Sequence, residues 1–546
     1  MFTKSKLLPV LGLIGLAAGG GAQAAGLVAA GNAFHISGST ALDNQIKDAL
    51  LLPSSVGGPC TAGTISIYTD APPLAGGNIT KAHQTTIVCA LANAIGSIPA
   101  STVVAFTKES NGGSNEGTFY PAAQQTLAFF DATQAPAGCT SEGAIAAGHY
   151  FTHQQAITAE FDGCTGVIVQ AIPDVGVADE DPALFNIGPQ AISSALIAKL
   201  NTTPLFQNQF AIAVSLNLYR ALQAQQGLTV GDDTLAQMPT LSKQQISGLF
   251  GGNITNWNQI VSSSGVGLAS STVYTCRRGD NSGSNVSADV YFLRNRCNYS
   301  LVGGALTAVG PSMVQISSGI SVANGGNGSP CAGLPASQTP ENNGCAWTAG
   351  AAPAGNLSDV TFGGTATGDV ISCLDAHSRP ASNTFAYGMI QPSSKFDDPN
   401  GVEATGEAGT AHFRYIAIDG HKPTVEGMAN GTYDYAMDNV ENLWTGLTGK
   451  PLAVGNFLGT LFQSPLALTD ILVAQPNAQS LAHAVDANYV TGGLQDGFTA
   501  TPNAPPVTVA VLDANPVSGF TLAFTGAVNN CQVPIEAGAS ISKEVF

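Results

Sequence analysis

Short runs of strand-forming apolar residues alternate along this chain with stretches that have the spacing of a helix. The apolar runs span 102–107, 166–173, 210–219 and 415–420, and the helix-like stretches span 41–51 and 189–200. Runs rich in Val, Ile, Phe and Tyr are typical of buried strands, and their alternation with helical segments predicts an α/β architecture. No repeat of roughly 20 to 50 residues is apparent, which argues against a solenoid.

Residues 1–24 have the features of a secretory signal. Two lysines precede an apolar run from Leu7 to Ala18, and residues 22–24 follow the A-x-A pattern of a cleavage site. The run is too short to cross a bilayer, and no later stretch provides roughly 18 uninterrupted apolar residues. We therefore expect a mature chain that begins after Ala24, resides in the periplasm or is secreted, and does not insert into a membrane.

The 10 cysteines form an even set without a C-x-x-C pair, which in an exported chain favours disulfides over a metal site. Pairing neighbours in sequence would join Cys60 to Cys89, Cys139 to Cys164, Cys276 to Cys297 and Cys331 to Cys345, and would leave Cys373 and Cys531. A strand runs from Cys276 toward the loop, and a helix of about 13 residues runs back toward Cys297. From the rise per residue of each element, the two cysteines would lie at about the same height along the strand. The sequence alone does not fix the connectivity.

Basic residues are scarce in this chain. Lys and Arg number 18 against 36 Asp and Glu, which gives a formal net charge of -18 over 546 residues. Such a surface disfavours nucleic-acid binding, which depends on clustered Lys and Arg. The same field repels anions in general, so an anion site would have to rely on local geometry.

Two strand ends carry small hydroxyl residues. Residues 37–40, Ser-Gly-Ser-Thr, end a strand and precede a helical pattern, and residues 106–117, FTKESNGGSNEG, form a similar loop. Glycine lets the backbone approach a ligand, and the N–H groups of a helix start form an anion cradle together with Ser and Thr hydroxyls. The simpler interpretations are an ordinary N-cap for the first stretch and a plain turn for the second.

Two further strand ends add charge. Asp179 ends an apolar strand in VGVADEDPALF (175–185), where a cap or turn residue is the simpler interpretation. The stretch YTCRRGDNSGSNVSADVYFLRNRC (274–297) places Arg277 and Arg278 before a Ser-Gly-Ser step and a helix. Most charged side chains face water, so the arginines are either solvated charges or one of them faces an anion at the helix start.

The order of several motifs adds a family resemblance. Near the start the chain reads ISGSTAL, between Leu241 and Ser284 it reads LSKQQISGLFGGNITNWNQI and then CRRGDNSGSN, and FAYGMI (385–390) and IAIDGHKPTVEGMANGTYDYAM (416–437) follow. In this order, across most of the mature chain, the motifs resemble those of the PstS family, the periplasmic phosphate-binding proteins of ABC-type uptake systems. That family shows G-K-I-x-x-W, R-R-x-D-G-S-G-T and DG-x-x-P-T patterns.

The resemblance implies a type II periplasmic-binding-protein fold, with two α/β lobes and a ligand cleft between them. Lobe one would comprise residues 25–210 and 431–546, and lobe two residues 211–430. Residues 317–368 are rich in Gly, Asn, Pro and Ser and contain two cysteines, so we interpret them as a disulfide-pinned surface insertion.

Carried over residue by residue, the resemblance implies a phosphate-binding set. Its members are Ser39, Thr40, Ala41, Ser110, Asn111, Asp179, Arg278, Ser282, Gly283 and Ser284. Arg278 would grip the anion, Asp280 would orient that arginine, and Arg277 would be a surface charge. Ser110 would supply the hydroxyl of its loop. Ala41 stands where the family has a phenylalanine, and Ser284 where it has a threonine.

The chemistry of these residue types fits a phosphate ligand. A guanidinium can donate two parallel hydrogen bonds to two phosphate oxygens. Asp179 repels anions in general, but it can accept a hydrogen bond from a protonated phosphate, whereas sulfate has no proton to give. The resemblance thus implies capture of inorganic phosphate, and of arsenate as a similar anion, for delivery to an ABC permease.

We expect no cofactor, no metal and no catalysis. The chain lacks a G-x-S-x-G elbow and an H-E-x-x-H helix, and its 8 histidines are scattered. Two alternatives remain at this level. One is a secreted surface or structural protein whose binding site has drifted, and the other is a phosphoester-processing enzyme built on the same anion cradle.

Overall fold

The computed structural model describes residues 27–463 with internal gaps, and beyond residue 463 only three two-residue strands. The longest gaps span 71–82, 314–360, 391–412 and 424–432. Several expectations lie outside the described residues: the signal at 1–24, Asn111, most of the insertion at 317–368, and the pairings of Cys297, Cys331, Cys345 and Cys531.

A ten-stranded sheet forms the first lobe. Its strands follow the order β20-β10-β19-β9-β1-β4-β3-β2-β7-β6. The bounds are β1 (Ala33–Gly38), β2 (Ser66–Thr69), β3 (Gln84–Ala90), β4 (Val103–Glu109), β6 (Thr140–Ile145), β7 (Ile157–Asp162), β9 (Val175–Ala178), β10 (Leu200–Gln209), β19 (Ala436–Trp444) and β20 (Val490–Thr491). β1 pairs in parallel with both β4 and β9, so these three strands end at the same edge of the sheet.

A six-stranded sheet forms the second lobe, in the order β12-β18-β11-β17-β13-β16. The bounds are β11 (Ala211–Ser215), β12 (Thr240–Leu241), β13 (Val273–Arg278), β16 (Thr361–Gly364), β17 (Phe385–Ile390) and β18 (Phe413–Ile418). Three strand pairs stand apart: β5 (Leu127–Phe130) with β8 (Ile168–Ala171), β14 (Tyr299–Val302) with β15 (Ala305–Ala308), and β21 (Phe520–Thr521) with β22 (Ile535–Glu536).

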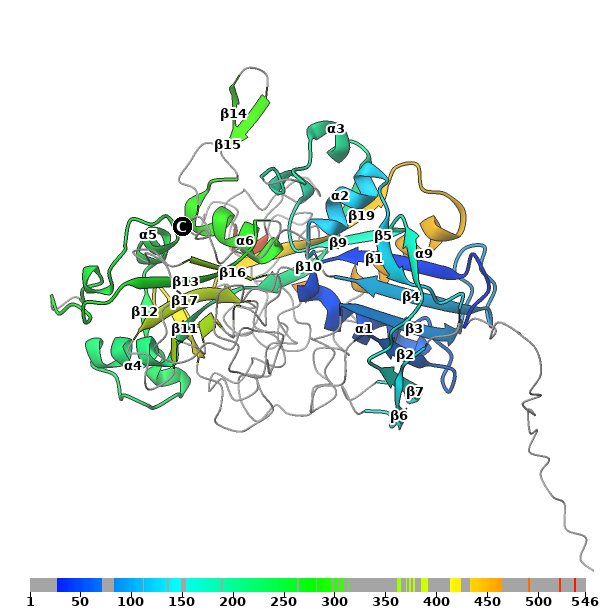
Figure 1. Ribbon diagram of the computed structural model, residues 1–546, viewed down its shortest axis with the longest axis horizontal. Coiled ribbons are helices and arrows are strands. Elements are labelled where there is room, and N and C mark those ends of the chain that lie inside the picture. Colours follow the sequence, from blue (N-terminus) through cyan, green and yellow to red (C-terminus); the bar gives the residue numbers. More distant parts are fainter. Residues whose placement is uncertain are drawn as a thin grey trace, which may run out of the picture.

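Helices flank both sheets, as Figure 1 shows. The α-helices are α1 (Asp43–Leu50), α2 (Glu116–Ala123), α3 (Ser194–Ile197), α4 (Leu216–Gln225), α5 (Lys243–Phe250), α6 (Gly283–Ala288) and α9 (Gly449–Gln463). Short 3-10 turns are η1 (Thr40–Leu42), η2 (Ser54–Val56), η3 (Pro182–Leu184), η4 (Leu235–Gln237) and η5 (Trp257–Gln259), and a π-helical turn, η6 (Asp289–Leu293), continues α6. The predicted α/β architecture is confirmed.

Two of the predicted elements differ from the structure. The apolar run 210–219 changes from strand β11 to helix α4 after Ser215, and the helix-like stretch 189–200 contains only the four residues of α3 before β10 begins at Leu200. An apolar run gives the same signal in a buried strand and in a buried helix, which explains the first difference. Ser193 caps α3 by accepting from the Leu196 N–H, but the helix ends within one turn.

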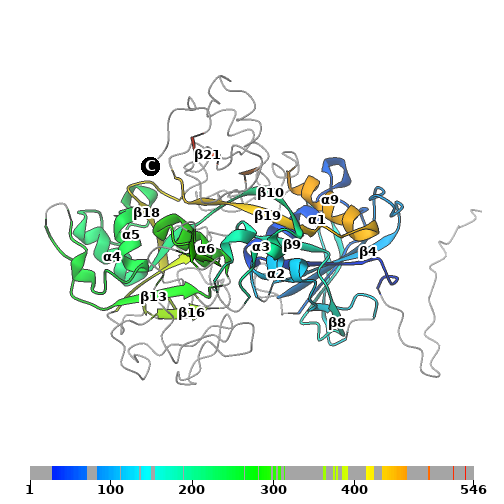
Figure 2. The same ribbon diagram turned by 90° about the horizontal axis from the view of Figure 1, so that it is seen from above.

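The two lobes are joined by β10 and β19, which pair antiparallel within the ten-stranded sheet and lead toward the other sheet in Figures 1 and 2. Phe210 alone separates β10 from β11, so the chain passes from one sheet to the other at this residue. The Phe210 N–H donates to the Tyr435 carbonyl at 2.9 Å, and the Tyr433 hydroxyl donates to the Phe210 carbonyl at 2.7 Å. The segment that leaves the first lobe at Phe210 and the segment that returns to it at Tyr433–Tyr435 are therefore hydrogen-bonded to each other at the junction.

The first lobe has a core of its own, and the core of the second lobe extends into the junction through residues such as Ala178 and Leu184. One cluster, around Phe34, Ile67 and Phe106, lies in the first lobe, and another, around Trp257 and Tyr387, lies mainly in the second. No helix in the described part of the chain combines the length and apolar character that crossing a bilayer requires.

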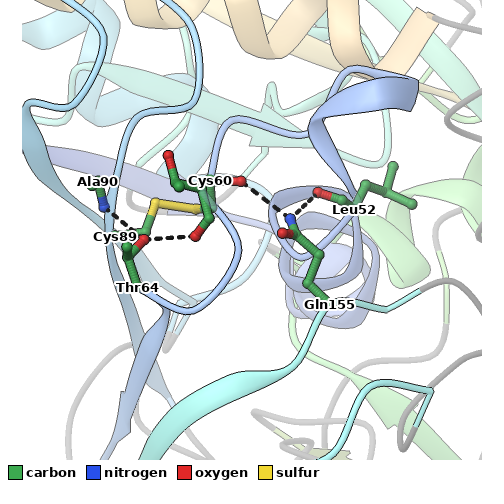
Figure 3. The surroundings of a disulfide bond; sticks show 7 residues. Leu52, Cys60, Thr64, Cys89, Ala90 and Gln155 are labelled. Atoms are coloured by element: carbon green, nitrogen blue, oxygen red, sulfur yellow. Dashed lines mark hydrogen bonds between the residues drawn. A yellow bond between two sulfur atoms is a disulfide. The ribbon is translucent and has the colours of Figure 1, made fainter. Parts of the chain in front are cut away.

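Three disulfides join described cysteines. Cys60–Cys89 and Cys139–Cys164 are confirmed as predicted from the order of the cysteines. Figure 3 shows Cys60–Cys89, beside which Gln155 Nε2 donates to the Leu52 carbonyl at 2.6 Å and to the Cys60 carbonyl at 3.2 Å.

The expected Cys276–Cys297 bond is wrong, because Cys276 pairs with Cys373. Successive side chains of a strand point to opposite faces. Cys276 belongs to the cluster of Cys373 and Leu374, whereas Val286 of α6 belongs to the cluster on the other side of β13. Following the helix back along the chain therefore leads to the wrong face of the sheet.

Candidate functional site

Asp179 is the acid at the centre of the candidate site. It directly follows β9, whose four residues are buried, and only 2% of its own surface is exposed. The Ser39 hydroxyl donates to Asp179 Oδ1 at 2.6 Å, and the Ser114 hydroxyl donates to Oδ2 at 2.8 Å. Burial raises the pKa of Asp179, and the two hydroxyl donors and the charge of Arg278 offset part of the rise. Asp179 is thus a desolvated carboxyl held from two sides.

The turn between β1 and α1 supplies the first of these hydroxyls. Ser39 caps η1, because its Oγ accepts a hydrogen bond from the Ala41 N–H at 3.0 Å. The same Oγ carries the proton that it donates to Asp179. The capping interpretation is therefore confirmed, and the same side chain also contacts the acid of the candidate site. Thr40 and Ala41 lie half-buried beside it.

The loop after β4 contains two buried serines with different partners. Ser110 donates to Asp43 Oδ2 at 2.9 Å and to the His83 carbonyl at 3.3 Å, so its hydroxyl is turned toward the start of α1. Ser114 is the hydroxyl of this loop that bonds Asp179. Sequence reasoning selected Ser110 and missed Ser114, since both stand in one Gly- and Asn-rich loop and no sequence signal tells which turns inward.

A buried lysine holds the first lobe's edge together. Lys108 Nζ donates to the carbonyls of Gly38 and Glu109, each at 2.9 Å, and lies 3.1 Å from Asp43 Oδ1. It thereby connects the end of β1, the end of β4 and the start of α1. Its charge also favours the ionised form of Asp179. Nothing in the sequence pattern marks Lys108 for this role except that basic residues are rare in the chain.

The two arginines at the end of β13 are both buried, each with 3% of its surface exposed. Arg277 Nε donates to the Arg278 carbonyl at 3.0 Å, and Arg277 Nη2 pairs with the Asp280 carboxylate. The expectation that Arg277 is a surface charge is therefore wrong. The expectation that Asp280 orients Arg278 is also wrong: neighbouring side chains at a strand end diverge, and the turn brings Asp280 back to the side of Arg277.

Arg278 faces the first lobe. A Cβ built on Gly113 would lie 3.6 Å from Arg278 Nη2, and the Arg278 charge acts on the carboxyl of Asp179. The structure thus brings together an arginine from the second lobe and an aspartate from the first. These two residues were predicted as members of one site.

The start of α6 also reaches the first lobe. Ser282, Gly283 and Ser284 are all buried, and Ser282 is the N-cap residue. A Cβ on Gly283 would lie 2.4 Å from both Asp179 Oδ2 and Ser114 Oγ, so only glycine fits between the helix start and the acid. The Ser-Gly-Ser step is therefore a point of close approach between the two lobes.

Asn285, in the first turn of α6, was not among the predicted site residues. Only 1% of its surface is exposed, and within the described residues neither its Oδ1 nor its Nδ2 has a hydrogen-bond partner. A buried amide with both groups unmatched is rare in native proteins and calls for a polar partner. Its place next to Ser284 makes it a candidate ligand contact, which the sequence could have suggested only through the polarity of CRRGDNSGSN.

The assembled site can bind a small oxyanion that carries a proton. Arg278 and the helix start provide donors, and the Asp179 carboxylate provides an acceptor beside them. Cys276, Cys373 and His377 form the one described cluster with metal-type ligand atoms close together, but the two cysteines are bonded to each other. That cluster is separate from the residues around Asp179.

Comparisons with known proteins find only distant similarity. No family model matches the chain, and no curated protein matches it. The ancestral soluble variant of the Human Phosphate Binding Protein matches 88% of this chain and 97% of its own, with 10% identity and a TM-score of 0.34. PstS from Borrelia burgdorferi matches 81% of this chain and 96% of its own, with 10% identity and a TM-score of 0.30. An ABC-type phosphate transport receptor from Vibrio cholerae matches 55% of this chain and 78% of its own, with 12% identity and a TM-score of 0.27.

With TM-scores this low, the fold assignment rests on the chain's own strand order and contacts. Two α/β sheets are joined by the crossing strands β10 and β19, and charged groups from both sheets meet beside that junction. This is the two-lobed α/β fold that the sequence motifs predict, with the candidate site beside the strands that join the lobes.

Proposed function

We propose that this protein binds inorganic phosphate between its two lobes, outside the cytoplasm. The observation that carries the proposal is the proximity of two buried and oppositely charged side chains from different lobes. The charge of Arg278 acts on the Asp179 carboxyl, and Arg278 lies beside the loop whose Ser114 bonds Asp179. A guanidinium alone would suit any oxyanion. A carboxylate held beside it restricts the ligand to an anion that can donate a proton.

The hydroxyl contacts of Asp179 support this restriction. Ser39 and Ser114 each donate to one carboxylate oxygen, which favours the ionised form despite burial. Each carboxylate oxygen can accept more than one hydrogen bond, so a phosphate O–H can be added to this arrangement. Sulfate has no such proton, and it would leave its oxygens against a buried negative charge.

The proposed binding set keeps Ser39, Thr40, Ala41, Asn111, Asp179, Arg278, Ser282, Gly283 and Ser284, and adds Ser114 and Asn285. Ser110, whose hydroxyl contacts Asp43 and His83, supports the loop instead of contacting the anion. We propose lobe boundaries at 25–210 with 431–546 and at 211–430. Arsenate should bind as phosphate does, because it has the same shape and also carries a proton at neutral pH. Delivery to an ABC permease is the role that we propose for the bound anion.

Calorimetric titration of protein stripped of bound ligand tests this function. We expect one phosphate per chain, competition by arsenate, and little competition by sulfate at equal concentration. Equal affinity for sulfate and phosphate would remove the role of Asp179, and the absence of binding by all three anions would contradict the proposal. A chromogenic phosphoester should remain uncleaved in the same preparation.

A further inference from the structure

Arg296 is a fully buried arginine that bonds three separate segments. Only 1% of its surface is exposed. Its Nε donates to Asp289 Oδ2 at 2.8 Å, its Nη1 to the Leu184 carbonyl at 2.9 Å, and its Nη2 to the Asp280 carbonyl at 3.1 Å. All three nitrogens of the guanidinium are therefore engaged, each with a different residue.

These partners lie on segments that carry the proposed anion site. The Asp280 carbonyl belongs to the turn between Arg278 and the helix start at Ser282. Asp289 opens the π-helical turn that continues α6. Both segments belong to the second lobe, so two of the three bonds fix the position of the arginine-bearing turn relative to its own helix.

The third bond crosses to the first lobe. Leu184 ends η3, the short turn that follows Asp179 by a few residues, and its side chain is buried. A hydrogen bond from Arg296 to the Leu184 carbonyl thus connects the turn after Arg278 with the turn after Asp179. This bond breaks if the two lobes separate, whereas the other two bonds do not.

The fork geometry of arginine is required for this arrangement. A planar guanidinium presents donors in several fixed directions, so one side chain can serve a carboxylate and two carbonyls at once. An ammonium in its place keeps the charge next to Asp289 but cannot span both carbonyls. Burial raises the pKa of Asp289 and the Arg296 charge lowers it, which matches a compensated buried pair.

We propose that Arg296 is a positioning residue that fastens the Arg278 turn to the Asp179 side of the site and holds the two lobes together. The inference rests on the proposed function for its effect on phosphate affinity, but its effect on lobe spacing is independent of any ligand. None of the hydrogen-bond partners of Arg296 belongs to the proposed binding set. Arg296 acts on phosphate binding through the positions of Arg278 and Asp179.

The test compares Arg296→Met and Arg296→Lys with Arg220→Met, a control at an exposed arginine on α4. Phosphate affinity and dissociation rate are measured by calorimetry and stopped flow, and the radius of gyration without ligand by small-angle X-ray scattering. We expect Arg296→Met to raise Kd by roughly 10- to 100-fold, mainly through faster dissociation, and to increase the radius of gyration. For Arg296→Lys, we expect Kd and the radius of gyration to lie between those of the wild type and Arg296→Met. The Arg220→Met control should have the wild-type values of both.

Each result decides the question. A variant that loses stability to urea but keeps the wild-type radius of gyration and dissociation rate would reduce Arg296 to a structural ion pair and overturn the inference. If Arg296→Met does not fold, Arg296→Lys decides in its place. If the wild type binds no phosphate, the proposed function fails, and the scattering comparison alone still tests the fastening role.

Discussion

The two lobes bring opposite chemistry to the place where they meet. The edge of the first lobe presents Asp179 with the hydroxyls of Ser39 and Ser114, and the edge of the second presents Arg278 and the start of α6. An acid with hydroxyl groups on one side and a cation with helix N–H groups on the other can both contact one ligand only when the lobes are together. The contrast suggests that recognition depends on closure more than on either lobe alone.

The paired arginines show the same contrast within a single lobe. Arg277 is neutralised locally by Asp280, whereas Arg278 acts on an acid of the other lobe. Arg277 therefore serves the fold of the second lobe, and Arg278 serves the junction. This distinction leads to the prediction with the largest effect.

Replacing Arg278 with alanine should remove most phosphate binding while the fold survives. Loss of a buried hydrogen-bonded charge partner costs about 2–5 kcal/mol, or roughly 30-fold to several thousand-fold in Kd. Lysine at this position should restore only part of the affinity. Calorimetry measures Kd, with circular dichroism as the control for folding.

The matched variant Arg277→Ala should instead lower the free energy of unfolding, because it leaves the Arg278 carbonyl and the Asp280 carboxylate without the donor that they share. Its effect on Kd should be smaller than that of Arg278→Ala in the same assay. If Arg277→Ala proves the more damaging to binding, Arg277 and not Arg278 serves the anion.

Disulfides allow a second comparison between the lobes. Cys276–Cys373 spans 97 residues and Cys60–Cys89 spans 29. In the chain-entropy model these loops correspond to about 4.7 and about 3.6 kcal/mol. Removing the first bond as a Cys276→Ala/Cys373→Ala pair should therefore destabilise the protein more than the corresponding removal of the second. Urea unfolding measures both, and the reverse order would show that native contacts outweigh loop length.

Glu441 should give the first lobe a pH-dependent stability. Its carboxyl is buried beside Gly459 of α9, and burial raises its pKa to about 8 from an ordinary value of 4.5. The folded state thus holds the proton more tightly than the unfolded state. The stability contributed by Glu441 is therefore greatest below pH 4.5 and falls until the pH passes about 8. The slope contributed by one proton is about 1.4 kcal/mol per pH unit.

The Glu441→Gln variant tests this slope, because glutamine has nearly the same shape and does not titrate. We expect the variant to lose the fall in stability between pH 5 and pH 8, relative to the wild type, in urea titrations at several pH values. An unchanged slope would mean that another group is responsible.

The smallest predicted effect separates two serines of one loop. Ser114→Ala removes a donor to Asp179 and should weaken phosphate binding by about 1 kcal/mol, or roughly fivefold. Ser110→Ala removes contacts to Asp43 and His83, and should leave Kd within about twofold of the wild type. Equal effects in calorimetry would argue that both hydroxyls face the ligand.

Much of the site could be predicted from the sequence because its motifs stand at strand ends, where chain order and spatial order agree. Asp179 and Arg278 follow this rule. The sequence does not encode which way a side chain turns: Ser114 contacts Asp179 whereas Ser110 contacts Asp43, and Asp280 pairs with Arg277. These choices depend on local rotamers and on packing from the other side of the sheet, which neither periodicity nor motif order encodes.

Long-range partners were equally hidden. The bond between Cys276 and Cys373 joins residues 97 positions apart, and Arg296 reaches Leu184 across 112 positions. A tertiary fold sets such contacts, and a single sequence has no signal for them. The α/β pattern could be predicted because it depends on short windows alone.

The most direct test of the account is the ratio of sulfate Kd to phosphate Kd in the wild type and in Asp179→Asn. It is measured by calorimetry at pH 8, because a higher pH favours the ionised form of a buried carboxyl whose pKa is raised. We expect the wild type to prefer phosphate strongly and the ratio to fall toward one in the variant, because asparagine brings no negative charge and can donate to sulfate. The same ratio in both proteins would contradict the claim that an acid from one lobe and an arginine from the other together select a protonated oxyanion.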